Sequence, residues 1–282
     1  MSDTVVDAII DEIAAATPEI REILSGRRGK TAKTNPSGET QIAADVKADE
    51  LLVDRLSDID GVGEIATEER EEKITCGNGY AVTLDPLDGS SNLKSNNPMG
   101  TIIGIYDAEL PAAGTELVAA GSVVYGPITT FTVARDGTVT EYEVINGTKT
   151  TANADMMLPD DPTVYGFGGG DAAWTDEFSE FANEIRHELK LRYGGAFVAD
   201  ISQVLTYGGI FAYPSLEGYP DGKLRLQFEG NPVAYITKHA GGASSDGSQS
   251  ILERSPEGLH DRVPVHVGNT SLIEKLERAL QG

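Results

Sequence analysis

Residues 85–92, Asp-Pro-Leu-Asp-Gly-Ser-Ser-Asn, constrain the fold more than any other part of the chain. They follow residues 81–84, a short apolar run that predicts a buried strand. The proline fixes its own backbone dihedral and the glycine permits a tight turn, so the strand is expected to end here. Asp85 and Asp88 are then presented together at the end of this strand.

This aspartate pair indicates a metal site beside a phosphate. Two carboxylates held so close cannot both stay ionised without a cation between them, and hard divalent cations such as Mg²⁺ prefer carboxylate oxygen. The following residues Gly89, Ser90, Ser91 and Asn92 offer backbone N–H groups and hydroxyls that suit a phosphate. Metal-assisted phosphoryl chemistry is therefore expected. The alternative is an Asx-type turn with a capping side chain, which the added proline, glycine and hydroxyl residues disfavour.

The composition excludes several classes of protein. With 282 residues, of which 39% are hydrophobic, the chain can form one large domain or two of ordinary size. No apolar stretch reaches the roughly 18 residues of a membrane span, and the first residues lack the pattern of a signal peptide. Cys76 is the single cysteine, so neither an intrachain disulfide nor a zinc–cysteine site is expected. These features favour a cytoplasmic protein.

Acidic residues outnumber basic ones by 45 to 22, which gives a net charge of −23. This excess repels nucleic acid and anionic membranes, so neither is expected as a partner. It would repel an anionic substrate too, unless metal ions neutralise the site. Because the acidity is spread along the whole chain, we favour adaptation to high salt, where the Debye length falls to roughly 3 Å at 1 M. An ordinary acidic cytosolic protein is the alternative.

Helical and strand patterns alternate along the chain, which predicts a layered fold of the α/β or α+β class. Helices are expected at residues 3–24, capped by Ser2 or Asp3, and at 44–59, 175–190, 197–207, 232–239 and 271–280. Strands are expected at 62–66, 81–84, 101–106, 117–125, 130–134, 139–144, near Val164, and at 209–213 and 223–227. The basic segment 25–38 is expected to be a loop, either a solvated linker or one that closes over the site. Arg135-Asp136-Gly137 is expected to form a hairpin turn.

A domain boundary is expected at Pro159-Asp160-Asp161-Pro162, where two prolines flank two acidic residues. It divides the chain into residues 1–160, an α+β domain, and residues 161–282, an α/β domain.

Further carboxylates follow other predicted strands or flank a helix. Glu68 and Glu69 come after the strand at 62–66; such a pair is usually solvated, but the nearby aspartates give it weight, because two metals need about four to six carboxylate oxygens. Glu229 follows the strand predicted at 223–227, and Glu39 and Asp45 flank the start of the second helix. Only the resemblance described next selects these last three residues.

Residues 84–92 closely resemble class I fructose-1,6-bisphosphatases, and part of this motif is shared with the wider lithium-sensitive sugar-phosphatase superfamily. Residues 100–106, 192–200, 207–214, 222–229, 231–235 and 240–243 resemble the same family in order and spacing, so the resemblance covers most of the chain. It implies the sugar-phosphatase fold, in which helices alternate with mixed sheets. It also implies the gluconeogenic, Mg²⁺-dependent hydrolysis of the 1-phosphate of fructose 1,6-bisphosphate.

The resemblance also implies roles for individual residues. Two or three Mg²⁺ ions per site, for which Mn²⁺ could substitute, would be held by Glu68, Asp85, Asp88, Glu229 and the Leu87 carbonyl. The attacking water would be polarised by Glu69 and Asp45, and Glu39 replaces a family aspartate beside a third metal. The 1-phosphate would be held by Gly89, Ser90, Ser91 and Asn92, and the sugar and 6-phosphate by Tyr193, Tyr213 and Lys223. Arg192 would reach that phosphate across a subunit interface of a homo-oligomer, a dimer or tetramer. The N-terminal domain would thus carry most metal ligands and the C-terminal domain the sugar-phosphate residues.

Three departures from the family are visible. Residues 165–171, Tyr-Gly-Phe-Gly-Gly-Gly-Asp, replace an Asn-Glu-Gly-Tyr segment at the 6-phosphate. This glycine run either opens a helix and offers backbone N–H groups or forms a flexible loop. Gly79-Tyr80 replaces the Lys-Tyr pair of AMP-regulated members, which argues against AMP inhibition. The cysteine-bearing redox loop of chloroplast forms is absent from the sequence.

Several functions remain open at this level. A sedoheptulose-1,7-bisphosphatase would have a similar site, whereas an inositol monophosphatase would not need Lys223 and Arg192 at a second phosphate. A sugar-phosphate-binding regulatory protein is the non-enzyme alternative, but it would not need a water-activating Glu69. Arg225 alternates with Lys223 and is interpreted as either a site residue or a structural ion pair. The four histidines lack ligand spacing and are expected on the surface or in the core.

The charge predicts a strong dependence of stability on salt. Removing salt lengthens self-repulsion to a Debye length of roughly 30 Å at 0.01 M, which should weaken the folded state. We expect the melting temperature to rise steeply with KCl and added Mg²⁺ to offset part of the loss at low salt by mass action. Calorimetry from dilute buffer to about 2 M KCl tests this; a melting temperature independent of KCl would rule out the high-salt adaptation.

Overall fold

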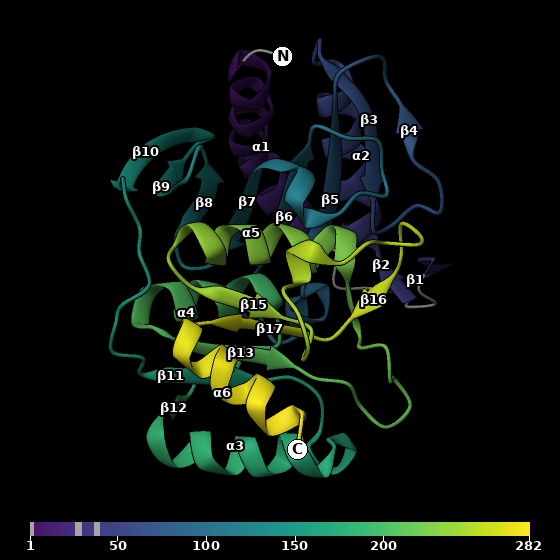
Figure 1. Ribbon diagram of the computed structural model, residues 1–282. Coiled ribbons are helices and arrows are strands. Elements are labelled where there is room, and N and C mark those ends of the chain that lie inside the picture. The colour runs from purple at the N-terminus through teal and green to yellow at the C-terminus, as the bar shows by residue number, and fades with distance from the viewer. Residues whose placement is uncertain (1–2, 26–29, 37–39) are drawn as a thin grey trace.

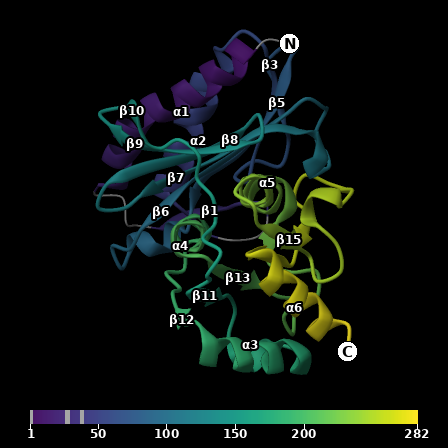
Figure 2. The ribbon, with the colours of Figure 1, turned by 60° about the vertical axis from the view of Figure 1, so that its left-hand side comes forward.

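The computed structural model describes residues 3–25, 30–36 and 40–282. Layers of helices and sheets alternate through the molecule, as Figure 1 shows and Figure 2 repeats from another side. One helical layer comprises α1 (Asp3–Leu24) and α2 (Ala43–Ser57), the middle one α4 (Phe197–Tyr207) and α5 (Asn231–His239), and the last α3 (Asp176–Glu188) and α6 (Thr270–Leu280). A large sheet separates the first two layers and a smaller sheet the last two. The layered α/β class predicted from the sequence is confirmed.

The larger sheet has eight strands in the order β10-β9-β8-β7-β6-β5-β3-β4, and neighbours are antiparallel except β3 and β5. Its strands are β3 (Val62–Thr67), β4 (Ile74–Thr75), β5 (Tyr80–Asp88), β6 (Met99–Tyr106), β7 (Leu117–Tyr125), β8 (Thr129–Arg135), β9 (Thr138–Ile145) and β10 (Thr148–Asn153). Both β5 and β6 are buried along their whole length because helices cover both faces of the sheet. The predicted hairpin turn between β8 and β9 is confirmed by positive φ angles at Asp136 and Gly137.

The smaller sheet has five strands in the order β12-β11-β13-β17-β15. They are β11 (Val164–Phe167), β12 (Lys190–Leu191), β13 (Gly209–Tyr213), β15 (Ala243–Ser245) and β17 (Val265–Gly268). The pairs β12–β11 and β11–β13 are parallel and the others antiparallel, so the sheet is mixed. Phe167, Phe178 and Phe181 pack together beneath it, where α3 and α6 cover its outer face.

Short elements complete the chain. Two small ribbons pair β1 (Lys30–Thr34) with β2 (Thr40–Ile42) and β14 (Leu224–Arg225) with β16 (Arg262–Val263). The 3₁₀ turns are η1 (Ser90–Leu93), η2 (Gly114–Glu116), η3 (Asp171–Ala173) and η5 (Ile251–Glu253), and a π-helical turn, η4, spans Leu226–Gly230. None of the helices within the described ranges is both long and apolar enough to cross a membrane.

The two sheets share one interior although they come from different halves of the chain. All strands of the larger sheet lie at or before Asn153, and those of the smaller sheet begin at Val164. A single cluster of buried apolar side chains nevertheless extends from Ala66 in the first half to Val267 in the second, around α4 and α5. The division into domains at residues 1–160 and 161–282 stays a prediction.

The loop predicted at residues 25–38 needs correction, and some other predictions concern residues that the structure does not describe. The segment 25–38 is not a loop throughout, because Lys30–Thr34 forms β1, which pairs with β2; within it only the two threonines favour a strand. Residues 26–29 and 37–39, which include Glu39, lie outside the described residues, as does Ser2.

Candidate active site

The aspartate pair lies at the end of β5, in the middle of the larger sheet. The strand does not end before Asp85, as the sequence predicted, but continues to Asp88 through an irregularity in its pairing with β6. This irregularity brings both carboxylates to the same place, and both side chains are buried. The Asx-type turn is present as well, because Asp85 Oδ1 accepts the Leu87 N–H at 3.0 Å. The Asx-type turn at Asp85 does not exclude a metal site formed by the same motif.

Glu229 reaches the aspartates from the second half of the chain. The strand predicted at 223–227 is wrong beyond Arg225, because the backbone winds into the π-helical turn η4, where the Asn231 N–H bonds to the Leu226 carbonyl. The Glu229 carboxylate turns back and accepts the Arg225 N–H at 2.7 Å. As a result, carboxylate oxygens of Asp85, Asp88 and Glu229 all lie within 4.8 Å of one another. Such π turns are frequent at functional sites.

Arg225 is the counterion of this carboxylate cluster. Its Nη2 atom lies 2.9 Å from Glu68 Oε1 and its Nη1 atom 3.8 Å from Glu229 Oε2, and the side chain is buried. Asn35 also donates to Glu68 Oε1, at 3.5 Å. The interpretation of Arg225 as a structural ion pair is therefore confirmed, although the residue also lines the site.

Burial and mutual repulsion raise the pKa values of the cluster. Desolvation, and then the charges of Glu68 and Asp88, hold the pKa of Asp85 well above its usual range. Desolvation raises the pKa of Asp88 to about 7, against the opposing effect of the Val198 N–H. Desolvation also raises the pKa of Glu229 to about 8, although Arg225 acts in the opposite direction. An added cation would favour the ionised form of these carboxylates, and the all-oxygen donor set fits a hard divalent ion such as Mg²⁺ or Mn²⁺.

A cleft of about 150 Å³ opens above the cluster and brings most of the predicted catalytic and phosphate residues together. Its remaining lining includes Asp45, Glu69, Leu87, Gly89, Ser90 and Ser91. Asp45 is buried at the start of α2, where its Oδ2 atom accepts the Ile42 N–H at 2.7 Å. Glu69 is only half-buried, so its carboxylate is accessible from the cleft.

Gly89 connects the carboxylate cluster to the loop of Ser90 and Ser91. Its φ of 72° is in the left-handed region, and an added Cβ would lie 2.2 Å from the Cβ of Ala196, so only glycine fits. Next to this contact, the Val198 N–H at the start of α4 donates to Asp88 Oδ2 at 2.8 Å. Asn92 donates its amide to the carbonyls of Pro98 and Gly194, both at 2.9 Å. The Asn92 side chain thus ties two loops together and does not line the cleft.

A second cleft, of about 160 Å³, joins the first through Asp88, Gly89 and Arg225. It brings together three predicted sugar-phosphate residues, Tyr193, Tyr213 and Lys223. Arg192, the fourth, is exposed and does not line this cleft within one chain.

Sequence reasoning did not select Asp200 as a residue of this second cleft. Its carboxylate accepts the N–H groups of Gly194 at 2.6 Å and Gly195 at 3.2 Å, and so shapes the loop that carries Tyr193. Burial raises the pKa of Asp200 to about 6, against these two hydrogen bonds. An acidic residue in the first turn of a helix that follows two glycines is the signal that could have identified it.

The glycine run at 166–170 packs against Tyr213 and does not open a helix. Helix α3 begins only at Asp176, after the short turn η3. The alternative in which the glycine run opens an α-helix, whose N–H groups could bind a phosphate, is therefore wrong. Gly168 donates its N–H to Ala212 and accepts from Trp174 Nε1, both at 2.9 Å. An added Cβ on Gly168 would lie 2.2 to 2.6 Å from atoms of the Tyr213 ring. The ring therefore occupies the space that a side chain would need.

The histidines play no visible part in either cleft. His187 is exposed on α3, His239 and His260 are half-buried, and His266 is buried in the smaller sheet, as the sequence predicted.

Buried carboxylates beside a loop rich in glycine and serine, with a lysine-lined cleft next to them, form the arrangement expected of a metal-dependent sugar phosphatase.

Comparisons with known proteins agree with this arrangement. Residues 5–148 match the fructose-1-6-bisphosphatase N-terminal domain, and residues 158–281 match the C-terminal domain. The class 1 fructose-1,6-bisphosphatase of Natronomonas pharaonis is 56% identical over 283 residues, which cover 99% of this chain and all of the relative. That of Haloarcula marismortui is 55% identical over 276 residues, 98% of this chain and 95% of the relative. Among solved structures, fructose-1,6-bisphosphatase of Leishmania major in holo form superposes with a TM-score of 0.93 at 27% sequence identity. The match covers 100% of this chain and 95% of that structure's chain.

The chain therefore belongs to the fructose-1,6-bisphosphatase family. The two archaeal relatives come from halophilic species, which agrees with the high-salt interpretation of the charge.

The raised pKa values predict that the metal-free protein loses stability as the pH rises. An acid whose pKa is raised in the folded state adds most to the free energy of unfolding at a pH below its unfolded pKa, which is about 4 for these groups. This contribution is lost as the pH rises from the unfolded pKa through the folded pKa. Since Asp88 and Glu229 have folded pKa values of about 7 and 8, the loss should fall between about pH 4 and pH 8. We expect Mg²⁺ to remove most of this loss, because a cation favours the ionised carboxylates. Calorimetry in EDTA and in Mg²⁺ tests this; parallel curves in the two buffers would contradict it.

Proposed function

We propose that the chain hydrolyses the 1-phosphate of fructose 1,6-bisphosphate to give fructose 6-phosphate and inorganic phosphate, with Mg²⁺ as its metal. The observation that carries this proposal is the junction of the two clefts. The carboxylate cluster opens through Asp88 and Gly89 into the cleft of Lys223, Tyr193 and Tyr213. One ligand can thus place one phosphate at the metal site and a second phosphate at the lysine.

The metal would be held by side chains that come from three separate segments. Glu68 follows β3, Asp85 and Asp88 end β5, and Glu229 lies in η4, with the Leu87 carbonyl as a further oxygen. When bound, the cation lowers the pKa of water and neutralises charge on the transferring phosphoryl group. Arg225 pairs with Glu68 and so offsets part of the negative charge of the cluster.

The remaining residues of the cleft would bind and orient the reacting groups. Glu69 and Asp45 would polarise the attacking water, because both residues line the cleft. The N–H groups of Gly89 and Ser90, with Ser91 beside them, would hold the 1-phosphate in the same cleft. Asn92 would act by holding the loop of Gly194 in place. Glu39 is proposed as an outer ligand of a third metal.

The sugar and its 6-phosphate would be bound in the second cleft. Lys223 supplies the charge, and the two tyrosines supply hydroxyls and ring faces. We propose that Arg192 adds a second charge in a homo-oligomer, from a neighbouring subunit, since its side chain is exposed in the single chain.

A panel of sugar bisphosphates tests the proposal. Phosphate release from fructose 1,6-bisphosphate, from a seven-carbon 1,7-bisphosphate and from an inositol monophosphate should be compared with Mg²⁺ and with Mn²⁺ in molar KCl. We expect the highest kcat/KM for fructose 1,6-bisphosphate with Mg²⁺. A higher value for the seven-carbon substrate would reassign the specificity, and binding without phosphate release would favour a regulatory role.

We expect Asp85→Asn and Asp88→Asn each to abolish turnover while the fold survives. Both remove a metal ligand and not an apolar core group, so the loss of kcat should be on the order of 10³-fold or more. Asp160→Asn, which removes the same charge from an exposed position, is the matched control and should retain activity. Near-normal Mg²⁺-dependent activity in either cluster variant would refute the metal assignment.

Gly168→Ala should weaken binding of the bisphosphate. The new methyl group would displace the Tyr213 ring, so we expect KM to rise roughly tenfold or more, with a smaller change in kcat. Gly170→Ala is the control in the same loop, because an added Cβ there meets no atom within 4 Å. Steady-state kinetics of both variants decide the matter: equal KM values would show that the position of Tyr213 does not matter for binding.

A further inference from the structure

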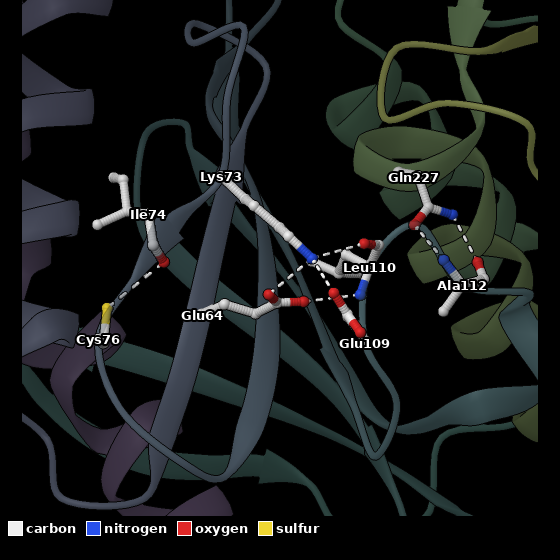
Figure 3. Close-up of polar contacts among 8 residues, drawn as sticks. All are labelled: Glu64, Lys73, Ile74, Cys76, Glu109, Leu110, Ala112 and Gln227. Atoms are coloured by element: carbon white, nitrogen blue, oxygen red, sulfur yellow. Dashed lines mark hydrogen bonds and ion pairs between the residues drawn. The ribbon is translucent and has the colours of Figure 1, made fainter.

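The buried amide of Gln227 makes a contact that the catalytic roles above do not explain. Gln227 lies in η4, two residues before Glu229, and its side chain has no exposed surface. Its Oε1 atom accepts the Ala112 N–H at 3.0 Å, and its Nε2 atom donates to the Ala112 carbonyl at 2.7 Å (Figure 3). The amide therefore binds both polar atoms of a backbone residue that is 115 positions away in the sequence.

The segment before Ala112 is anchored to the larger sheet. The Leu110 N–H donates to Glu64 Oε1 at 2.7 Å, and the Leu110 carbonyl accepts from Lys73 Nζ at 2.9 Å. Lys73 is itself held by ion pairs to Glu64 at 2.9 Å and to Glu109 at 2.8 Å, as Figure 3 shows. Since Glu64 lies in β3, the strand that leads to Glu68, polar contacts run from the sheet through residues 110–112 to Gln227.

This connection matters because η4 is an irregular element that carries one ligand of the cluster. Glu229 comes from the second half of the chain, whereas Asp85 and Asp88 come from the sheet. The three carboxylates repel one another when ionised, and Arg225 offsets this repulsion only in part, so a contact that fixes η4 against the larger sheet helps to keep Glu229 beside the aspartates. A neutral amide restrains η4 without adding charge to the cluster. Asn231 adds a weaker bond, from Nδ2 to the same Ala112 carbonyl at 3.4 Å.

We propose that Gln227 is a positioning residue for the metal site: its two hydrogen bonds to Ala112 hold η4 against the larger sheet and so keep Glu229 in reach of a cation shared with Asp85 and Asp88. The proposal rests on the metal-binding role given to these carboxylates above. Residues that orient metal ligands typically change metal affinity by 10- to 100-fold when replaced.

The test compares metal affinity in Gln227→Met with that in Asn269→Leu. The methionine keeps the volume of the side chain and loses both bonds. Asn269 is the matched control, because its amide likewise bridges two backbone segments, accepting from Gly209 at 2.7 Å and donating to Pro159 at 2.8 Å, away from both clefts. Binding of Mn²⁺ to each full-length protein is measured by titration calorimetry in molar KCl, and the activation curve for Mg²⁺ is measured in parallel.

We expect Gln227→Met to lower the affinity for Mn²⁺ about tenfold or more and to raise the Mg²⁺ concentration for half-maximal activity similarly, with kcat at saturating metal largely retained. Asn269→Leu should lower the melting temperature without changing metal affinity. Unchanged affinity in Gln227→Met, or an equal loss in Asn269→Leu, would overturn the proposal. If Gln227→Met does not fold, Gln227→Asn serves instead, since it keeps a neutral amide that is one methylene too short to bond both polar atoms of Ala112; unchanged affinity there would overturn the proposal equally.

Failure of this inference and failure of the proposed function give different results. If the unaltered protein binds no Mn²⁺, the metal site itself is wrong, and the role of Gln227 falls with it. If the unaltered protein binds Mn²⁺ and Gln227→Met binds it equally well, only the role of Gln227 is wrong.

Discussion

Glu68, Asp85, Asp88 and Glu229 are buried together around the guanidinium of Arg225, and the surrounding fold must balance the repulsion among them. Burial removes the water that would solvate these charges, and one arginine cannot neutralise four carboxylates. The raised pKa values of the two aspartates and Glu229 are the consequence. A fold that keeps such a cluster together must restrain each carboxylate by its own backbone and must leave room for a cation.

The layers of the fold supply these restraints from different directions. The end of β5 presents the aspartates, the start of α4 donates the Val198 N–H to Asp88, and η4 brings Glu229 from the far side. Gly89 allows the end of β5 to approach Ala196, just before α4, closely enough for these contacts. The site therefore lies where the larger sheet meets the middle helical layer, and neither half of the chain forms it alone.

The net charge of −23 and the anionic ligand of the site oppose each other. An anionic substrate would be repelled by such a surface in dilute buffer, but molar salt shortens the range of this repulsion to a few ångströms, roughly the length of one contact. Lys223 and Arg225 line the second cleft, so a short-range attraction to an anion bound there would survive the screening that removes long-range repulsion. The same protein can thus carry an acidic surface and bind a phosphate ester.

The alternation of helices and strands and the aspartate motif at the end of β5 could be predicted from the amino-acid sequence. These features depend on residues close together in the chain, where periodicity, proline, glycine and β-branched side chains report directly on the backbone. Glu229 was selected only through the family resemblance. The sequence did not reveal that residues 226–230 form a π turn and not a strand, or that Asp200 shapes the loop of Tyr193. The same holds for the ring of Tyr213 against Gly168 and for the amide of Gln227 on Ala112. The last two contacts join residues far apart in the sequence, 115 positions for Gln227 and Ala112, and depend on how the layers pack, which a local pattern does not record. The π turn and the Asp200 contacts are local, but the residues that form them give no periodic signal.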